Sequence, residues 1–173
     1  SLLLQPAYPP ERAYQLSLLA GVAAIDALRA AYPSGIDGLR LKWPNDVLVG
    51  PAKLGGILVE STMLGGRLSA VVGDPPATNL SVNGIMIPPA AMLNCLSKSF
   101  RIAYKAWDDG RKFSSIRASW LDRAGPPGEP MSVNAGAGLA MGTFAGLDES
   151  GALLLTGSDG STIRYTFGDV TLT

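Results

Sequence analysis

One short polar segment holds the residues of this chain that are best suited to chemistry. It reads Lys42-Trp43-Pro44-Asn45-Asp46 and continues shortly afterwards with Lys53-Leu54-Gly55-Gly56-Ile57. Two lysines, an Asn-Asp pair and a glycine pair therefore lie close together in the sequence. Apolar runs beside them are typical of β-strands, with a turn over 50–52; the runs are 39–41, 47–49 and 57–59. Buried strands do not need so many polar groups in one place, so the segment predicts a β-hairpin with a functional site at its mouth.

Each polar side chain in this segment has a functional and a structural interpretation. Asn45 can donate and accept hydrogen bonds, which suits contacts to a nucleotide or phosphate, or it forms an Asx turn after Pro44. Gly55 and Gly56 let a ligand approach the backbone, or they mark a tight crossing of strands. Asp46 holds Lys53 in place, or it forms a purely structural ion pair with Lys42 or Lys53. Trp43 packs beside a ligand ring or, more often for a tryptophan on a strand, in the core.

Helices and short strands must position this segment. Apolar residues at helical spacing predict one helix over 11–31, beginning after Pro9-Pro10, and a second from Pro88-Pro89 to about 108. A shorter helix is predicted over 113–122. In the second helix a stripe of apolar side chains favours a core position over a binding groove, and it consists of Leu93, Leu96, Phe100, Ala103 and Trp107. Further strands are predicted over 2–5 and 68–72, the latter following a Gly65-Gly66 turn.

The run Gly125-Pro126-Pro127-Gly128 is the expected domain boundary. Beyond it, turn signals separate short β-rich runs, which predicts a small all-β barrel. Its expected strands are 131–134, 141–147, 152–156 and 163–167. The chain would thus divide into a first domain over 1–124 and a second over 128–173.

Composition excludes several classes of function. The chain has no histidine, so a Ser-His-Asp or Cys-His hydrolase and a histidine zinc site are excluded within these residues. It has 14 basic and 14 acidic residues, and this balance gives no electrostatic footprint for nucleic acid. No apolar run is as long as a membrane span. Its one cysteine cannot form an intrachain disulfide, which favours the cytoplasm.

The two polar motifs resemble the core signature of the biotin protein ligase family. That family carries K-W-P-N-D on one strand and, after a hairpin, a lysine–hydrophobic–small–G-I-L element on the next. The resemblance extends, more weakly, over nearly the whole chain: 1–4 and 11–31 are similar to a strand and the central helix, and 131–172 to a terminal SH3-like barrel. It implies an α+β fold, with the mixed sheet and packed helices of class II aminoacyl-tRNA synthetases and biotin ligases, followed by the SH3-like β-barrel.

The same resemblance implies a biotin–[biotin carboxyl carrier protein] ligase, which uses ATP to join biotin to a carrier lysine through biotinyl-5′-AMP. Lys53 would be catalytic, neutralising the biotin carboxylate and the α-phosphate. Asp46 would also be catalytic, either by holding Lys53 or by helping to deprotonate the carrier lysine. Lys42 ranks below Lys53. The substrate-binding residues would be Trp43, Asn45, Lys53, Gly55, Gly56 and Ile57.

The implied ligands and partners follow from this reaction. Biotin and ATP would be the substrates, and Mg²⁺ is expected with ATP, although the sequence assigns it no ligands. The protein partner would be the biotin carboxyl carrier protein or the carrier subunit of a biotin-dependent carboxylase. Neither a membrane nor nucleic acid is expected from these residues, and a homodimer stays open, as does a DNA-binding domain upstream.

Two departures from the family pattern accompany the resemblance. The family's basic, glycine-rich loop belongs upstream of Ser1, and the strand 68–73 should lead into a G-x-G-x-N element where Asp74-Pro75-Pro76 stand instead. We expect that both segments are omitted from this sequence, so that the N-terminal part of the catalytic domain is missing. Two alternatives stay open: a lipoate or octanoate ligase of the same fold, and a truncated, non-catalytic paralogue that acts as a binding module.

Overall fold

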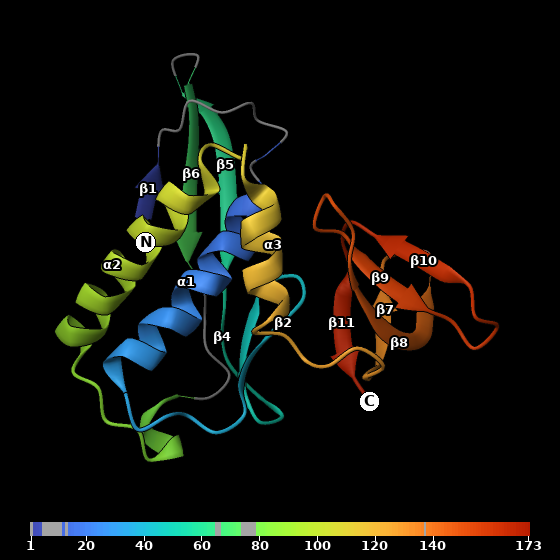
Figure 1. The fold of residues 1–173 in the computed structure, drawn as a ribbon, viewed down its shortest axis with the longest axis horizontal. Helices are drawn as coiled ribbons and strands as arrows, with labels where there is room; N and C mark the ends of the chain where they lie inside the picture. The colour runs from blue at the N-terminus through green and yellow to red at the C-terminus, as the bar shows by residue number, and fades with distance from the viewer. Residues whose placement is uncertain (1, 5–11, 13, 65–66, 74–78, 137) are drawn as a thin grey trace.

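A computed structural model describes residues 2–4, 12, 14–64, 67–73, 79–136 and 138–173, with backbone only for 61–64 and 67–73. The predicted turn at Gly65-Gly66, the helix start at Pro9-Pro10 and the Asp74-Pro75-Pro76 run therefore lie outside the described residues. The described chain forms a helical and sheet region beside a compact barrel (Figure 1).

Three helices form the helical layer of the first region: α1 (Gln15–Ala31), α2 (Pro89–Trp107) and α3 (Phe113–Leu121). A short 3-10 turn, η2 (Ser81–Asn83), precedes α2. The three predicted helices are confirmed, and the ends of α2 and α3 lie within a residue or so of the predicted ones. Pro88 and Pro89 open α2, as expected for residues that lack an N–H group at the point where a helix leaves its first amides unpaired.

Two small sheets pack with these helices. One has the order β1-β6-β5 and contains β1 (Leu2–Leu4), β6 (Arg67–Gly73) and β5 (Leu58–Leu64). The other has the order β2-β3-β4 and contains β2 (Leu39–Lys42), β3 (Asp46–Val49) and β4 (Ala52–Gly56). The strand pairings of both sheets are antiparallel in the described residues, and a parallel bridge joins Leu41 to Ala124.

Close packing of α1 depends on its small residues. Leu16, Leu19 and Ile25 are fully buried along its inner face. A Cβ atom added at Gly21 would lie 3.2 Å from the Leu41 side chain of β2, so this position allows the helix to approach the sheet closely. The helix thereby fixes the strand that leads into the polar hairpin.

The apolar stripe of α2 is core along only half of its length. Phe100, Ala103 and Trp107 are buried, whereas Leu93 is 63% exposed and Leu96 36% exposed. The expectation that the whole stripe is core was therefore wrong at its N-terminal end. Periodicity identifies which face of a helix is apolar, but it does not say how far a neighbour covers that face.

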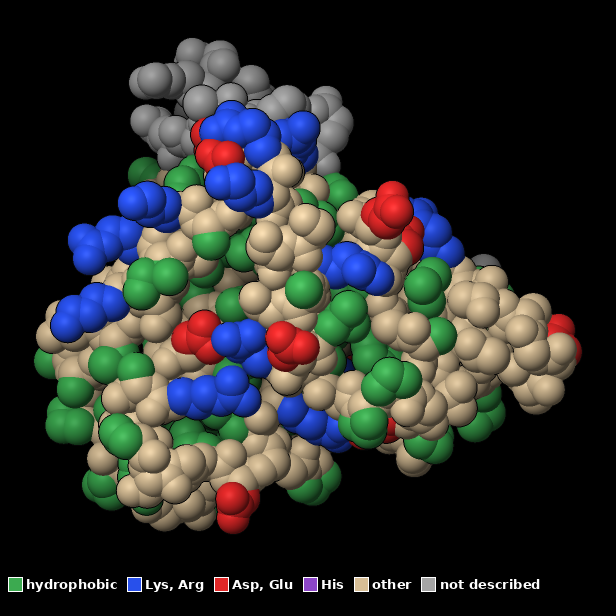
Figure 2. Space-filling view, in the orientation of Figure 1, with side chains coloured by type: hydrophobic (Ala, Val, Ile, Leu, Met, Phe, Trp, Pro, Cys, Tyr) green, Lys and Arg blue, Asp and Glu red, His purple; other side chains and the backbone are tan. Residues whose placement is uncertain are grey.

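The opposite face of α2 is basic. Lys98, Arg101 and Lys105 are exposed, and the helix contains no acidic residue. Figure 2 shows blue Lys and Arg side chains gathered along the α2 side of the molecule. The neutral net charge of the chain therefore conceals a local positive surface. None of the described helices is long and apolar enough to cross a membrane.

The barrel is an antiparallel sheet of five strands in the order β10-β9-β8-β7-β11. Its strands are β7 (Pro130–Asn134), β8 (Leu139–Leu147), β9 (Leu153–Thr156), β10 (Thr162–Tyr165) and β11 (Asp169–Leu172). The four predicted strands are present, and β11 is an additional one. It pairs with β7, so the barrel core includes Val133 and Val170.

The barrel is docked on the first region by specific contacts. A Cβ atom added at Gly151 would lie 2.7 Å from the Leu18 side chain of α1, and the positive φ of Gly151 (+91°) also favours glycine. The indole nitrogen of Trp43 donates a 3.1 Å hydrogen bond to the Gly151 carbonyl. Arg40 forms an ion pair with Glu129. The barrel therefore contacts the same strand, β2, that leads into the polar hairpin.

Candidate active site

Strand register brings the charged residues of the hairpin to one face. Lys42 at the end of β2 pairs directly with Asp46 at the start of β3. A bulge between Val47 and Leu48 shifts the pairing with β4, so that Leu48 pairs with Lys53. Because Leu48 and Asp46 are two residues apart on one strand, the side chain of Lys53 emerges on the face that carries Asp46.

A buried carboxylate shared by two lysines forms the centre of the site. Asp46 is 7% exposed, and each of its oxygens forms an ion pair with the ammonium group of one lysine. The Oδ1 atom lies 2.8 Å from Lys53 Nζ, and Oδ2 lies 2.9 Å from Lys42 Nζ. The Lys42 side chain is 16% exposed and that of Lys53 is 37% exposed. With both lysines charged the cluster has a formal charge of +1, and Lys53 is the cation that reaches solvent.

Lys42 takes a larger part in the charged cluster than its sequence neighbours indicated. The sequence predicted that Asp46 pairs with one lysine or the other, and Lys42 ranked second. The structure pairs Asp46 with both. Lys42 also donates a 2.6 Å hydrogen bond to the Val170 carbonyl of the barrel. The signal that could have found this is the short, closed turn between Lys42 and Asp46, which makes them cross-strand partners.

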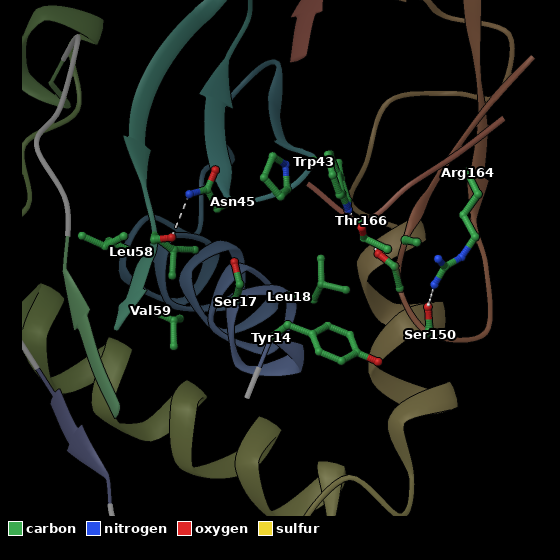
Figure 3. A pocket seen from close by; sticks show the side chains of 14 residues that line it. Tyr14, Ser17, Leu18, Trp43, Asn45, Leu58, Val59, Ser150, Arg164 and Thr166 are labelled. Atoms are coloured by element: carbon green, nitrogen blue, oxygen red, sulfur yellow. Dashed lines mark hydrogen bonds between the residues drawn. The ribbon is translucent and has the colours of Figure 1, made fainter. Parts of the chain in front are cut away.

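Trp43 and Asn45 have structural partners. Trp43 is 4% exposed and hydrogen-bonded to Gly151, so the core alternative describes it better than stacking on a ligand. The amide nitrogen of Asn45 donates to the Ile57 carbonyl at 2.9 Å, which connects the hairpin tip to the residue between β4 and β5 (Figure 3). The Asn45 side chain therefore bonds to a residue twelve positions along the chain rather than forming a local Asx turn.

Two cavities border the hairpin. Five of the six predicted binding residues line one or both of them, whereas Lys53 lines neither. A cavity of about 600 Å³ lies between the start of α1, the hairpin tip and the barrel, and Trp43 and Asn45 line it. A second cavity of about 740 Å³ lies between β4, α1 and α2, and Gly55 and Gly56 line it. Ile57 lines both. Lys53 and Asp46 lie on the chain between these two sets of residues.

Gly55 has open space where a side chain would lie, and its φ is not among the positive values that by themselves favour glycine. A Cβ atom built on it meets no described atom within 4 Å. A glycine required by a tight crossing of strands would meet a neighbour at this distance. The structure therefore favours the interpretation that Gly55 leaves room for a ligand beside the backbone.

Sequence reasoning missed the far wall of the first cavity. Tyr14 and Ser17 come from the start of α1, and Ser150, Arg164 and Thr166 come from the barrel (Figure 3). The sequence predicted turns and strands in this part of the barrel, including the strand 163–167, but no contact with the first domain. No local pattern in 150–166 indicates that these residues face the hairpin.

An ion pair orders the barrel side of that cavity. Arg164 contacts the Asp148 carboxylate and donates a 2.7 Å hydrogen bond to Ser150 Oγ. Burial alone would raise the pKa of Asp148, but hydrogen bonds from Arg164, Ser150 and the Ala152 amide outweigh burial and hold this pKa well below its ordinary value. Asp148 is therefore ionised at neutral pH.

The second cavity is mainly apolar. Phe100, Leu93 and Leu96 of α2 line it beside Gly55 and Gly56. Burial and then the charge of Asp109 raise the pKa of Tyr104, which also lines this cavity and therefore carries a protonated hydroxyl at neutral pH. In the described part of the chain, no three His, Cys, Asp or Glu side chains gather in a way that could hold a metal ion.

Two family models match the chain. Residues 1–73 match the biotin/lipoate A/B protein ligase family, and residues 128–172 match the biotin protein ligase C-terminal domain. The first match contains the whole hairpin, and the second contains all five strands of the barrel.

Relatives of known name match most of the chain. It is 34% identical to the biotin–[acetyl-CoA-carboxylase] ligase of Paracoccus denitrificans, over 92% of this chain and 74% of that protein. It is 30% identical to the bifunctional ligase/repressor BirA of Bacillus spizizenii, over 92% of this chain. There the match covers 54% of the relative, so the chain spans about half the length of that ligase/repressor.

Solved structures share the fold. The apo biotin protein ligase of Aquifex aeolicus superposes with a TM-score of 0.81, 23% identity, and coverage of 99% of this chain and 80% of that one. A biotin protein ligase-like protein of Silicibacter superposes with a TM-score of 0.75 and 22% identity, over 95% of this chain and 76% of that one. At these identities the likeness establishes the α+β fold with its C-terminal barrel.

Proposed function

We propose a mechanism for the hairpin site from one premise, which is that the chain belongs to the biotin protein ligase family. The reaction is the ATP-dependent attachment of biotin to a lysine of a carrier protein, through biotinyl-AMP. The family model of residues 1–73 covers both biotin and lipoate ligases. The C-terminal domain model and the Paracoccus relative favour biotin over lipoate or octanoate as the substrate.

The partly exposed ammonium of Lys53, held by a buried carboxylate, is the observation that supports this mechanism most strongly. In the first step the biotin carboxylate attacks the α-phosphate of ATP and pyrophosphate leaves. Two anions must approach each other, so a fixed cation close to both lowers the barrier. Lys53 supplies this cation. Because Asp46 already restrains its side chain, little conformational freedom has to be lost when the substrates bind.

In the second step the amine of the carrier lysine attacks the mixed anhydride and AMP leaves. We assign Asp46 the role of anchor for Lys53 rather than that of general base. Each Asp46 oxygen is already paired with the ammonium group of a lysine, Lys53 at 2.8 Å and Lys42 at 2.9 Å, and the carboxylate is 7% exposed. An incoming amine would have to displace one of these ammonium groups to give Asp46 its proton.

Gly55 and Gly56 provide the surface against which the substrates lie. Gly55 has open space beside its Cα atom, and it follows Lys53 and Leu54 in the bulged strand β4. Ile57 follows with apolar contact area that borders both cavities. A ligand that reaches Lys53 can therefore lie along the backbone of β4. Asn45 contributes indirectly, because its hydrogen bond holds the Ile57 carbonyl in place.

Mg²⁺ is the cation expected with ATP. The described residues contain no group of three His, Cys, Asp or Glu side chains that could hold a metal ion. The phosphates of ATP would then be its main ligands. The steps above depend only on side chains of this chain.

The acceptor follows from the family. We infer that it is the biotin carboxyl carrier protein, or the carrier subunit of another biotin-dependent carboxylase, because the Paracoccus relative is a ligase for acetyl-CoA carboxylase. The interaction would present one carrier lysine to the adenylate beside Lys53.

A direct assay tests this function. The purified chain is incubated with Mg·ATP and either biotin or lipoate, and the acyl-adenylate is detected by mass spectrometry; a carrier domain is then added and its mass is measured. We expect biotinyl-AMP and a carrier heavier by one biotinyl group. An adenylate with lipoate alone would favour the lipoate ligase alternative. Biotin binding without any adenylate would favour the non-catalytic paralogue.

A further inference from the structure

Lys42 is held between two acceptors that come from different regions of the molecule. Its Nζ atom lies 2.9 Å from Asp46 Oδ2 and donates to the Val170 carbonyl at 2.6 Å, across 128 residues of sequence. Val170 lies on β11, is 2% exposed and pairs with Val133. The carbonyl is therefore a rigid acceptor, and the Lys42 side chain, 16% exposed, has little freedom to leave it.

The two neighbouring contacts of the same strand keep this geometry in place. Trp43 donates its indole N–H to Gly151, and Arg40 pairs with Glu129. Only Lys42 among these three residues also contacts Asp46. Lys42 is therefore the point at which docking of the barrel is connected to the charged cluster of the hairpin.

We propose that Lys42 is a positioning residue through which the C-terminal barrel keeps the Lys53 charge available to substrates. This role rests on the proposed function. Lys42 neutralises Asp46 from one side and ties it to the barrel, so the second oxygen of Asp46 can orient Lys53 without cancelling the positive charge of the cluster. Without Lys42, Asp46 and Lys53 form a pair of zero net charge, and the carboxylate is free to turn both oxygens toward Lys53.

The proposal separates the charge at the site from the docking of the barrel. Lys42→Met keeps most of the apolar stem and removes the ammonium group. Lys42→Arg keeps a positive donor that can still serve both acceptors. Arg40→Met is the matched control, because it removes another contact between the same strand and the barrel and leaves Asp46 untouched.

Steady-state kinetics of biotinyl-AMP formation give the first readout. We expect Lys42→Met to lower kcat by about tenfold or more, as for the loss of one charge-assisted contact, with KM for biotin changed less than about threefold. Lys42→Arg and Arg40→Met should each retain kcat within about threefold. Equal losses in Lys42→Met and Arg40→Met, or a Lys42→Arg variant as slow as Lys42→Met, would overturn the proposal.

Chemical labelling gives a second readout that does not require activity. Lysine reductive methylation, followed by peptide mass spectrometry, measures how readily Lys53 loses its proton. In Lys42→Met, the positive charge beside Lys53 is absent and Asp46 is no longer shared with Lys42. The labelling of Lys53 should therefore slow severalfold. In Arg40→Met it should not change. An unchanged Lys53 labelling rate in Lys42→Met refutes the inference, whereas an unmodified chain that forms no biotinyl-AMP refutes the proposed function instead.

Discussion

Replacing Lys53 by alanine separates the catalytic role of this residue from its contribution to the fold. The ion pair that is lost joins a 37% exposed lysine to Asp46, and pairs with an exposed partner contribute about 0.2–1 kcal/mol. Asp46 would still be paired with Lys42 at 2.9 Å, so no buried charge is left alone. We therefore expect the free energy of unfolding to fall by about 1 kcal/mol at most, which corresponds to a fall in Tm of about 2–4 °C for a chain of this size.

The effect on the first chemical step should be far larger. In the proposed mechanism the Lys53 ammonium contacts both the biotin carboxylate and an α-phosphate oxygen. Each charge-assisted contact contributes about 1.5–3 kcal/mol, so the two together amount to roughly 3–6 kcal/mol. At 1.36 kcal/mol for each factor of ten, the rate of biotinyl-AMP formation should fall by roughly 10²–10⁴. In an ordinary assay this is a loss of detectable activity.

Two measurements on one preparation test this reasoning. Rapid quench followed by mass spectrometry gives the rate of biotinyl-AMP formation, and urea unfolding gives stability. Lys98→Ala, an exposed lysine on α2, is the matched control and should be active. Adenylate synthesis at the unmodified rate by a folded Lys53→Ala variant would refute the assigned role. A loss of several kcal/mol of stability would show that Lys53 is mainly structural.

Three further substitutions test other parts of the site. Gly55→Ala adds a methyl group where no described atom lies within 4 Å. Urea unfolding should therefore show unchanged stability or a gain of about 0.4–1 kcal/mol, while the rate of adenylate formation falls. Full activity of the variant would contradict a ligand beside this backbone. Asp46→Asn leaves two ammonium groups without their carboxylate, and we expect a loss of about 3 kcal/mol in urea unfolding. Asp148→Asn tests the lowered pKa of Asp148. A carboxyl group whose pKa is lower in the folded state contributes its full stabilisation above its unfolded pKa, which is near 4. That contribution is lost as the pH falls further. The variant should therefore be less stable than the unmodified chain by about 1 kcal/mol at pH 7, and the difference should shrink below pH 4; a difference that grows with acid would contradict the assignment.

The sequence predicted those elements of the fold that depend on local pattern. The bounds of α2 and α3 follow from apolar periodicity and from the paired prolines before α2, and both are local properties. The strand β11 was not predicted, because its pairing with β7 is set by the barrel and leaves little trace in a four-residue strand. The exposure of the N-terminal half of the apolar stripe on α2 could not be predicted either. Leu93 and Leu96 line a cavity whose other walls come from distant elements.

The candidate site was predicted as a segment more accurately than as a geometry. Lys42, Asp46 and Lys53 were all singled out, but the sharing of one carboxylate depends on strand register and on the bulge opposite Val47. The contribution of the barrel was not visible at all. Arg164 lines a cavity beside the hairpin and the Val170 carbonyl accepts a hydrogen bond from Lys42 only through tertiary packing, which no short-range pattern encodes.

The position of Trp43 gives the molecule an optical probe of its own junction. The chain has three tryptophans, and the other two, Trp107 and Trp120, are buried within the helical region. Trp43 alone donates its indole N–H to a carbonyl of the barrel. Indole emission shifts to longer wavelength when the ring gains access to water. Replacing the other two tryptophans with phenylalanine would therefore leave a single fluorophore whose emission wavelength reports loss of this contact, for example during urea unfolding.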